Sequence, residues 1–381
     1  MNHKVEDYLF SKLFLLAGKM SKSEFKKIVK HYKWKFNYQK VHIVGTNAKG
    51  SIANFLNDEL ILQNYQVGLF SSPHLFSPYE RIKINDHLID FEKIVKYTSD
   101  FQSQFPEINF GFFDLFFLCA LRWFEEYRVD LAIFEAGIGA KKDVVNYLDY
   151  DLTIFGTINL DHQDILGQTL KAIAQDKACA IKTNNQVYLM NLIDSKIQPI
   201  FQSRAQKFNA NLKIIPVDPT DFYQTNKSYV QAILKDYFKI ENFQSGFHLP
   251  AGRMKKITIN KYDCLADVAH NLEGIQAVIA YLKKHQINYQ QVVVSLSSDK
   301  DHQQILKLLA EHFQLVLIYQ NHGRKPLMIN DYPQDYYGGK IYNLSSWLKK
   351  LDQATLFIGS FYFISELLKE VKNGNKNNFK F

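Results

Sequence analysis

A lysine, a glycine and a serine close a short loop between a predicted strand and a predicted helix. The apolar run 41–44 ends at Gly45, and Lys49, Gly50 and Ser51 follow before apolar residues recur at helical spacing. Backbone N–H groups at a helix start bind phosphate, lysine adds a positive charge, and a serine hydroxyl can bind a metal ion or phosphate. The order Lys-Gly-Ser departs from the usual Gly-Lys-Ser. The strand and helix around it still favour nucleotide binding over a structural turn.

Reactive side chains also follow three other apolar runs that we predict to be strands. Ser72 follows the second run, Glu135 ends the third and His162 follows the fourth. Ligands of open α/β sheets bind beyond the carboxyl ends of strands, and Mg²⁺ there prefers oxygen ligands. Taken singly, Glu135 could begin a solvated turn, His162 could be structural, and Ser72 could belong to a turn. Their occurrence at successive strand ends favours a single site.

The alternation of apolar runs with helical periods predicts the sheet that positions these residues. It favours an α/β fold in which helices cover a parallel sheet. We predict strands over 41–44, 66–70, 130–135, 152–158, 186–190 and 212–216, and helices over 51–64, 91–104, 112–127, 168–182 and 193–208. Later in the chain we predict strands over 262–267, 291–296, 314–319 and 355–358, and helices over 272–285, 302–313 and 361–371.

The second series of strands and helices predicts a second domain. The 381 residues suffice for two domains, and a Pro/Gly-containing stretch at 249–253 separates the two series. We therefore predict a phosphate-loop domain with a parallel sheet over 1–249 and a smaller, Rossmann-like α/β domain over 250–371. Residues 372–381 lack apolar periodicity and are predicted to be a frayed tail.

Composition limits the classes of partner. The net charge of +8 suits anionic ligands. The lysines are scattered and no RNA-binding motif is present, so the charge alone does not indicate nucleic-acid binding. Cys119, Cys179 and Cys264 are odd in number and far apart, which argues against a disulfide framework or a Cys-based zinc site and favours a reducing compartment.

The N-terminal apolar run, residues 8–17, follows two acidic residues and contains Lys12. This pattern predicts an amphipathic helix rather than a signal peptide. No run in the sequence approaches the roughly 20 apolar residues of a membrane span.

A series of short motifs extends from the phosphate loop almost to the C-terminus. It includes Gly-Thr-Asn-Ala-Lys-Gly-Ser at 45–51, Ser-Ser-Pro-His-Leu at 71–75, Glu-Arg-Ile-Lys-Ile-Asn at 80–85, Glu-Ala-Gly-Ile-Gly at 135–139, Asn-Leu-Asp-His at 159–162, Asp-Lys-Ala-Cys-Ala-Ile-Lys at 176–182, Pro-Ala-Gly-Arg-Met at 250–254, Asp-Val-Ala-His-Asn at 267–271 and Ile-Gly-Ser-Phe-Tyr at 358–362. In this order the chain resembles the folylpolyglutamate synthase and dihydrofolate synthase family, within the Mur-ligase-like, ATP-dependent amide-bond-forming ligases.

The resemblance implies residues that bind ATP. Those of the phosphate loop are Asn47, Ala48, Lys49, Gly50 and Ser51. Three further nucleotide contacts are implied outside the loop, at Asn226, Arg253 and Asp267.

The resemblance also implies a site for one or two magnesium ions. Its ligands would be Ser72, Glu135, His162 and Lys177, the lysine as a carbamate formed with CO₂. A carbamate presents carboxylate-like oxygens, and its formation requires a neutral amine, so the lysine pKa must fall below about 10.4. The implied catalytic residues are Lys49, Lys177 and His162.

The implied reaction is ATP- and Mg²⁺-dependent addition of L-glutamate to the carboxylate of a folate or dihydropteroate. The carboxylate would attack the γ-phosphate of ATP, and the amine of glutamate would attack the resulting acyl phosphate. Phe76, Tyr79 and the aromatic stretch 110–117 are candidates for a pterin slot, although such stripes are more often core. We expect small-molecule substrates and a cytoplasmic monomer that binds neither nucleic acid nor membrane.

Three alternatives stay open. The chain could be a Mur-type ligase that acts on another carboxylate, a phosphate-loop protein that binds RNA or regulates, or a non-catalytic relative. The last is motivated by Ala48 and Ala140, which replace glycines usual in the family. Lys141 replaces an arginine common in the family. If position 48 needs a positive φ, alanine strains it.

Overall fold

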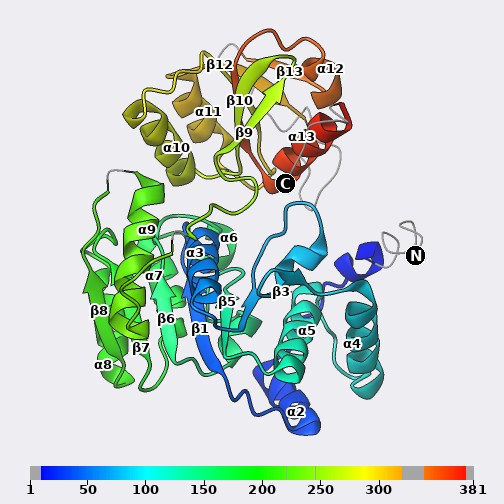
Figure 1. The fold of residues 1–381 in the computed structure, drawn as a ribbon, viewed down its shortest axis with the longest axis vertical. Coiled ribbons are helices and arrows are strands. Elements are labelled where there is room, and N and C mark those ends of the chain that lie inside the picture. The colour runs from blue at the N-terminus through cyan, green and yellow to red at the C-terminus, as the bar shows by residue number, and fades with distance from the viewer. Residues whose placement is uncertain (1–9, 220, 245, 320–338, 375–381) are drawn as a thin grey trace. The chain divides into compact units, whose positions relative to one another are not determined.

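The computed structural model describes residues 10–219, 221–244, 246–319 and 339–374. The chain divides into two compact units, residues 1–219 with 223–248 and residues 220–222 with 249–381 (Figure 1). Each unit is built on its own sheet, and the predicted α/β class is confirmed.

The first unit contains an eight-stranded sheet in the order β4-β3-β2-β5-β1-β6-β7-β8. Its strands are β1 (Gln39–Val44), β2 (Val67–Phe70), β3 (Ile82–Ile84), β4 (His87–Leu88), β5 (Leu131–Glu135), β6 (Leu152–Phe155), β7 (Gln186–Met190) and β8 (Asn211–Ile215). The six neighbouring strands β2-β5-β1-β6-β7-β8 pair in parallel. Strand β3 pairs antiparallel with both β2 and β4. Ile43 of β1 pairs with Glu135 of β5, so the carboxyl ends of the central strands lie at one edge.

The helices of this unit are α2 (Lys22–Tyr32), α3 (Lys49–Leu62), α4 (Phe91–Gln104), α5 (Phe112–Tyr127), α6 (Gln163–Leu166), α7 (Leu170–Lys177), α8 (Gln198–Lys207) and α9 (Phe222–Ile233). The predictions for α4 and α5 match the observed bounds. The helix predicted over 168–182 is wrong beyond Lys177, because a short 3₁₀ turn follows and Ile181 is extended. The helix predicted over 193–208 begins at Gln198 instead, where Pro199 favours a first turn.

Two short strands, β3 and β4, and three helices, α2, α6 and α9, are not among the predicted elements. Strands β3 and β4 form a hairpin, of which only Ile82–Ile84 lies within a motif that we quoted. Helix α2 begins with a capping box, in which Ser21 and Glu24 bond each other's backbone N–H groups. The strand predicted over 152–158 stops at Phe155, and residues 156–159 instead contact the phosphate loop.

Aromatic side chains of α5 fill the core against the sheet. The Phe117 and Phe124 rings lie 5.8 and 5.9 Å from that of Phe134 in β5. Gly68 in β2 allows this contact, since a Cβ there would lie 2.8 Å from Phe124. Under β6, Phe155 packs against Phe201 of α8 at 5.0 Å. The sheet is therefore anchored by helices near both its ends.

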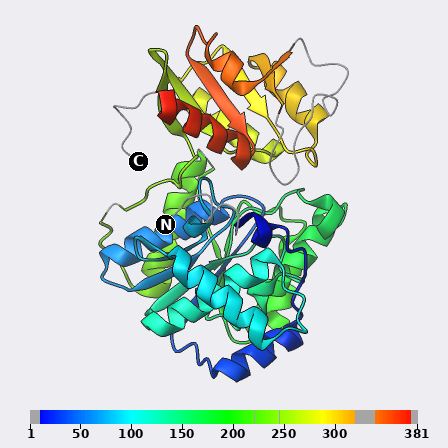
Figure 2. The same cartoon turned by 90° about the vertical axis from the view of Figure 1, so that its right-hand side faces the viewer.

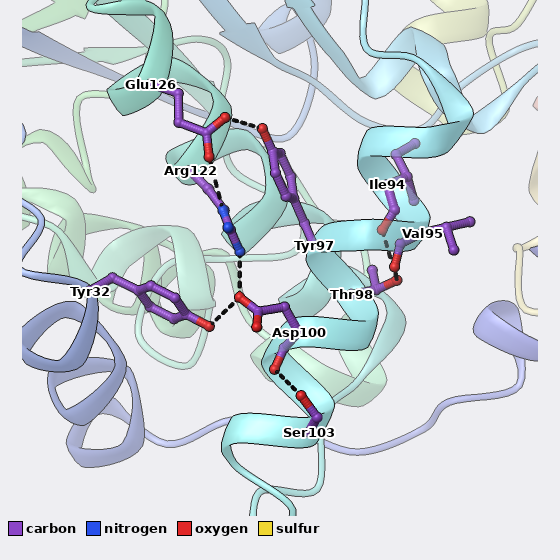
Figure 3. Close-up of polar contacts among 9 residues, drawn as sticks. All are labelled: Tyr32, Ile94, Val95, Tyr97, Thr98, Asp100, Ser103, Arg122 and Glu126. Atoms are coloured by element: carbon purple, nitrogen blue, oxygen red, sulfur yellow. Dashed lines mark hydrogen bonds and ion pairs between the residues drawn. The ribbon is translucent and has the colours of Figure 1, made fainter.

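A polar network joins α2, α4 and α5 (Figure 3). Arg122 of α5 donates to Asp100 of α4 at 2.6 Å and to Glu126 at 3.0 Å, while Tyr32 of α2 donates to the same Asp100 oxygen at 2.8 Å. Tyr97 of α4 donates to Glu126. Helices α4 and α5 lie side by side in both views (Figures 1 and 2). The network ties helix α2 to this pair.

The second unit contains a six-stranded sheet in the order β13-β12-β11-β14-β10-β9, parallel except for β9. Its elements are β9 (Lys255–Ile259), β10 (Tyr262–Asp267), α10 (Leu272–Lys284), β11 (Gln291–Ser295), α11 (His302–Ala310), β12 (Gln314–Ile318), β13 (Lys340–Tyr342), α12 (Leu344–Leu348), β14 (Thr355–Gly359) and α13 (Phe361–Gly374). Strands β9 and β13 and helix α12 were not predicted.

Both ends of the chain extend beyond the described residues. Within the predicted amphipathic N-terminal helix, residues 10–14 are helical, and the residues before them lie outside the described part. The predicted tail began at 372, but α13 continues to Gly374, and 375–381 lie outside the described residues. No helix among the described residues is long and apolar enough to cross a membrane.

Candidate functional site

The loop between β1 and α3 is held against the segment that follows β6. The Thr46 N–H donates to Thr157 O at 2.6 Å, and Asn47 pairs with Thr157 in an isolated bridge. The Thr46 hydroxyl donates to Asn159 O and accepts from Asn159 N–H, both at 3.0 Å. Gly156 is required at this approach, because a Cβ there would lie 2.5 Å from Asn47 O. The loop is therefore fixed by backbone contacts before any ligand is considered.

Ala48 has φ 70° and ψ −14°, in the left-handed region, and is the N-cap of α3 without a side-chain hydrogen bond. Alanine is strained in this conformation and glycine is not. The departure from the family's glycine at this position therefore carries a local energetic cost.

Ala48→Gly is expected to raise the free energy of unfolding of the first unit by about 1 kcal/mol, because it relieves left-handed strain at a helix N-cap. Ala53→Gly, in the same helix, is the matched control and should lower stability by at least about 1 kcal/mol. Chemical denaturation of both variants measures the two effects. A loss of stability in Ala48→Gly would contradict the strain.

Two lysines share one backbone acceptor at the start of the loop. Lys49 Nζ donates to Gly45 O at 3.1 Å and to Thr46 O at 3.2 Å. Lys177, the last residue of α7, donates to the same Gly45 oxygen at 2.9 Å. Lys177 is 4% exposed, and burial, with the nearby charge of Lys49, lowers its pKa to about 7. The Lys177 amine is therefore neutral in a large fraction of molecules near neutral pH.

Glu135 connects two strand ends to the first turn of α3. Its Oε2 accepts the backbone N–H of Ser72 at 3.0 Å, and the side chain is buried. A Cβ on Gly50 would lie 3.8 Å from Glu135 Oε1, which places the carboxylate directly beside the helix start. The structure thus brings Ser72, Glu135 and Gly50 together, as their positions at strand ends predicted.

His162 lies across a small cavity from the two lysines. The cavity, of about 10 Å³, has space for one water-sized group. It is lined by Gly45, Thr46, Lys49, Gly137, Ile138, Gly139, Asp161, His162, Leu166 and Lys177. His162 is itself left-handed, with φ 47°, and its Nε2 lies 3.8 Å from Asp161 Oδ2. The segments that follow three strands, β1, β5 and β6, therefore meet at this cavity.

Two aspartates that the sequence did not single out as site residues shape the wall of this cavity. Asp143 accepts the N–H groups of Gly137 and Ile138 at 2.7 and 3.2 Å, and burial raises its pKa to about 6. Asp176, next to Lys177, accepts the N–H of Ala140 at 2.7 Å. Asp176 begins the quoted motif 176–182, and Asp143 follows the quoted motif 135–139 by four residues. An acid close to glycine-rich loop residues is the signal that could have identified Asp143.

The other predicted residues do not line this cavity. Asn226 is buried in α9 and does not line the cavity. Arg253 and Asp267 belong to the second unit, where they form an ion pair at 3.6 Å, and Asp267 also accepts the Met254 N–H. Burial raises the pKa of Asp267, and the charge of Arg253 opposes that shift.

Most of the aromatic stretch 110–117 is core, so its interpretation as a pterin slot is wrong for the buried rings. Phe110, Phe112, Phe116 and Phe117 are at most 9% exposed. Phe113, Phe76 and Tyr79 are partly exposed. Tyr79 packs edge-on against Phe10 at 5.2 Å.

The described residues contain no group of three or more His, Cys, Asp and Glu side chains that could hold a metal ion. The predicted ligand set contributes two side chains of these types, Glu135 and His162. A serine oxygen and a modified lysine would have to supply the remaining protein ligands. The carboxylate, hydroxyl and carbamate oxygens of such a set suit magnesium.

Comparisons with known proteins give relatives of related description, two of which follow, although no family model matches the chain. A putative folylpolyglutamate synthase of Dictyostelium discoideum is 31% identical over 185 residues, which cover 46% of this chain and 29% of that protein. The dihydrofolate synthase/folylpolyglutamate synthase of Bacillus subtilis is 26% identical over 400 residues, which cover 87% of this chain and 90% of that protein. The chain thus matches less than a third of the first relative's length and most of the second's.

Solved structures show the same fold. Escherichia coli FolC, solved with ADP and without folate substrate, gives a TM-score of 0.84 at 20% identity over 98% of each chain. A bifunctional folylpolyglutamate synthase/dihydrofolate synthase of Yersinia pestis, solved with AMPPNP and Mn, gives 0.81 at 19% identity over 96% of this chain and 97% of that one. At these identities the similarity concerns the fold.

Proposed function

We propose that the chain is a member of the folylpolyglutamate synthase and dihydrofolate synthase family, like the relatives it resembles, and that it is an ATP-dependent ligase. It adds L-glutamate to the carboxylate of a folate or dihydropteroate through an acyl phosphate. The observation that carries the proposal is the meeting of Lys49, Lys177, Glu135 and His162 around the β1–α3 loop.

The nucleotide phosphates bind at the start of α3. The N–H groups of the first turn and the charge of Lys49 attract the phosphate oxygens. Lys49 exchanges its two carbonyl acceptors, Gly45 and Thr46, for phosphate oxygens when the nucleotide binds. Asn47, Ala48, Gly50 and Ser51 line the same turn, and Asn226, Arg253 and Asp267 are proposed to contact the rest of the nucleotide.

The chemistry demands positioning and charge neutralisation more than covalent help from the protein. The acceptor carboxylate and the γ-phosphate are both negative, so a cation must lie between them as the acyl phosphate forms. Lys49 supplies one such charge. The amine of glutamate then attacks the acyl carbon and phosphate departs.

Ser72, Glu135, His162 and carbamylated Lys177 are proposed as the residues that hold one or two magnesium ions. The bound ion would offset charge on the transferred phosphoryl group. Support for this set comes from the Ser72 N–H bond that orients Glu135 and from its position beside Gly50. Support for the carbamate comes from the burial of Lys177 beside the phosphate loop, where a long cationic side chain is otherwise costly.

We further propose that the substrates are small molecules and that the protein acts as a cytoplasmic monomer without nucleic-acid or membrane partners. The three cysteines are all unpaired, which supports a reducing compartment. Light scattering of the purified chain measures its oligomeric state, and an RNA filter-binding assay over a salt series measures nucleic-acid affinity.

The purified protein is expected to release ADP only when ATP, Mg²⁺, L-glutamate and a pterin-type acceptor are all present. Dihydropteroate and a reduced monoglutamyl folate, compared in one assay, separate addition of the first glutamate from addition of later ones. Product mass confirms that each turnover adds one glutamate. Absence of turnover with both acceptors would remove this function, and turnover with another carboxylate would favour a different ligase of the Mur type.

A further inference from the structure

A second cavity of the first unit is much larger than the one beside His162. Its volume is about 630 Å³, within the usual range for sites of small ligands. Three chain segments form most of its wall, namely the start of α2, the turn 141–147 and the residues that follow α7. No residue of the proposed metal set or of the phosphate loop lines it. The cavity is therefore separate from the site proposed above for the ligase chemistry.

Six cationic side chains line this cavity, and no acidic side chain does. They are Lys19, Lys22, Lys141, Lys142, Lys182 and Arg204. Across the described residues, none of the six forms an ion pair within 4 Å, although ion pairs are common elsewhere on the unit. The charge of Lys19 acts to lower the pKa of two more distant carboxylates, Asp114 and Asp143, which do not line the cavity. Six like charges around one space leave a strong positive field.

Two of these cationic side chains are fixed by contacts with neighbouring residues. Lys182 is half-buried and donates to Asn146 O at 2.6 Å. The Arg204 guanidinium lies 4.1 Å from the Phe208 ring centroid, and its buried Nε–H donates no hydrogen bond within the part of the chain described. Asn146, which also lines the cavity, has a buried Oδ1 without a partner there. Arg204, held against Phe208, and Lys182, held by Asn146, therefore place two fixed positive charges in the wall of the cavity.

From this arrangement we propose that the cavity is a binding site for a small multivalent anion, one that carries at least two phosphate or carboxylate groups. A monovalent anion would neutralise only one of the six positive charges. A nucleic acid is a poorer match, because the charges surround a single cavity instead of following a line over the surface. Lysines bind both phosphate and carboxylate as point charges, so the geometry specifies the charge of the ligand more closely than its chemical type.

The anion site shares two chain segments with the candidate active site. Gly137–Gly139 line the small cavity, whereas Lys141 and Lys142 line the large one. Lys177 lines the small cavity and Lys182 the large one, and the Asp176 bond to Ala140 N–H joins the two segments. An anion that binds both Lys141 and Lys182 therefore contacts the same loop whose residues 137–139 line the small cavity.

Calorimetric titration of the full chain with inorganic pyrophosphate and with citrate, at constant ionic strength, tests the proposal. Acetate serves as the monovalent comparison. The Lys22→Gln/Lys142→Gln pair removes two exposed charges and should leave folding unchanged. It is expected to weaken binding of the multivalent anion by about tenfold or more, since charge-assisted contacts are lost. The matched control pair, Lys171→Gln/Lys196→Gln, removes two exposed lysines of the same unit that do not line the cavity and should bind as the unchanged protein does.

Pyrophosphate could also bind at the phosphate loop, so Lys49→Met is titrated in parallel. Retention of the anion site in Lys49→Met, with loss in the Lys22/Lys142 pair, supports the proposal. Tighter binding of pyrophosphate identifies a phosphate ligand, and tighter binding of citrate identifies a carboxylate ligand. Equal weakening by both lysine pairs, loss of binding only in Lys49→Met, or affinity no greater than that for acetate would overturn it. None of these outcomes depends on ligase turnover.

Discussion

Glu135→Gln is expected to lower kcat by about a hundred- to a thousandfold without unfolding the chain. The amide keeps an oxygen that can accept the Ser72 N–H, so the local hydrogen bond survives. The negative charge beside Gly50 is lost, however, and with it the strongest oxygen donor of the proposed magnesium site. Steady-state turnover over a range of Mg²⁺ concentrations measures the effect, and thermal unfolding monitors the fold.

An exposed glutamate in the same unit provides the control. Glu92→Gln, in the first turn of α4, removes one charge far from the strand ends and should leave kcat within about twofold. Near-normal turnover in Glu135→Gln at low Mg²⁺ would exclude this carboxylate from the metal site. A loss of activity that follows loss of folded protein would point to a structural role instead.

Lys177→Met is expected to reduce turnover by at least about a hundredfold, because methionine fills similar space but can neither form a carbamate nor donate to Gly45 O. The pKa of Lys177 near 7, lowered first by burial, means that the neutral amine becomes the major form as pH rises through 7. Carbamate, which needs that form, should increase between pH 6 and 8. Carbon-13 NMR of protein supplied with labelled bicarbonate detects the modified side chain directly.

Lys171→Met is the matched control, since Lys171 is exposed in the same helix, α7. It should retain both turnover and the labelled signal. An active protein that shows no labelled signal above pH 7 would exclude the carbamate. A signal that persists in Lys177→Met would assign the modification to another lysine.

Much of the fold could be predicted because its strongest signals are local. The β-branched run before Gly45 and the apolar period after Ser51 gave β1 and α3 within a few residues. The short antiparallel strands were not predicted, because a strand of three residues such as Ile82–Ile84 is too short to show a clear alternation. Strand β9 alternates through Ile257 and Ile259 and then turns at Asn260 and Lys261, both with positive φ, so its signal was present but unused.

The candidate site was predictable at the ends of parallel strands and less so between them. Ser72 and Glu135 had to meet once β2 and β5 paired in register. The shared acceptor Gly45 O, by contrast, depends on where α7 ends, and the predicted end at residue 182 lies five residues beyond the observed one. The residues that line the large cavity come from α2, α8 and two turns, which are far apart in the sequence. No local sequence pattern predicts that they lie together.

The hydrogen bonds of Tyr32, Arg122 and Tyr97 have a consequence for how the molecule opens. Helix α2 precedes the first strand of the sheet. Without contacts to other helices, it would open locally and its amide protons would exchange by fraying. Its bond to Asp100 and the packing of Tyr32 on Phe101 couple it to α4 and α5 instead. Amides of α2 should therefore exchange with deuterium at the same rate-limiting opening as the α4–α5 pair. Helix α2 then behaves as one cooperative unit with residues some seventy positions away.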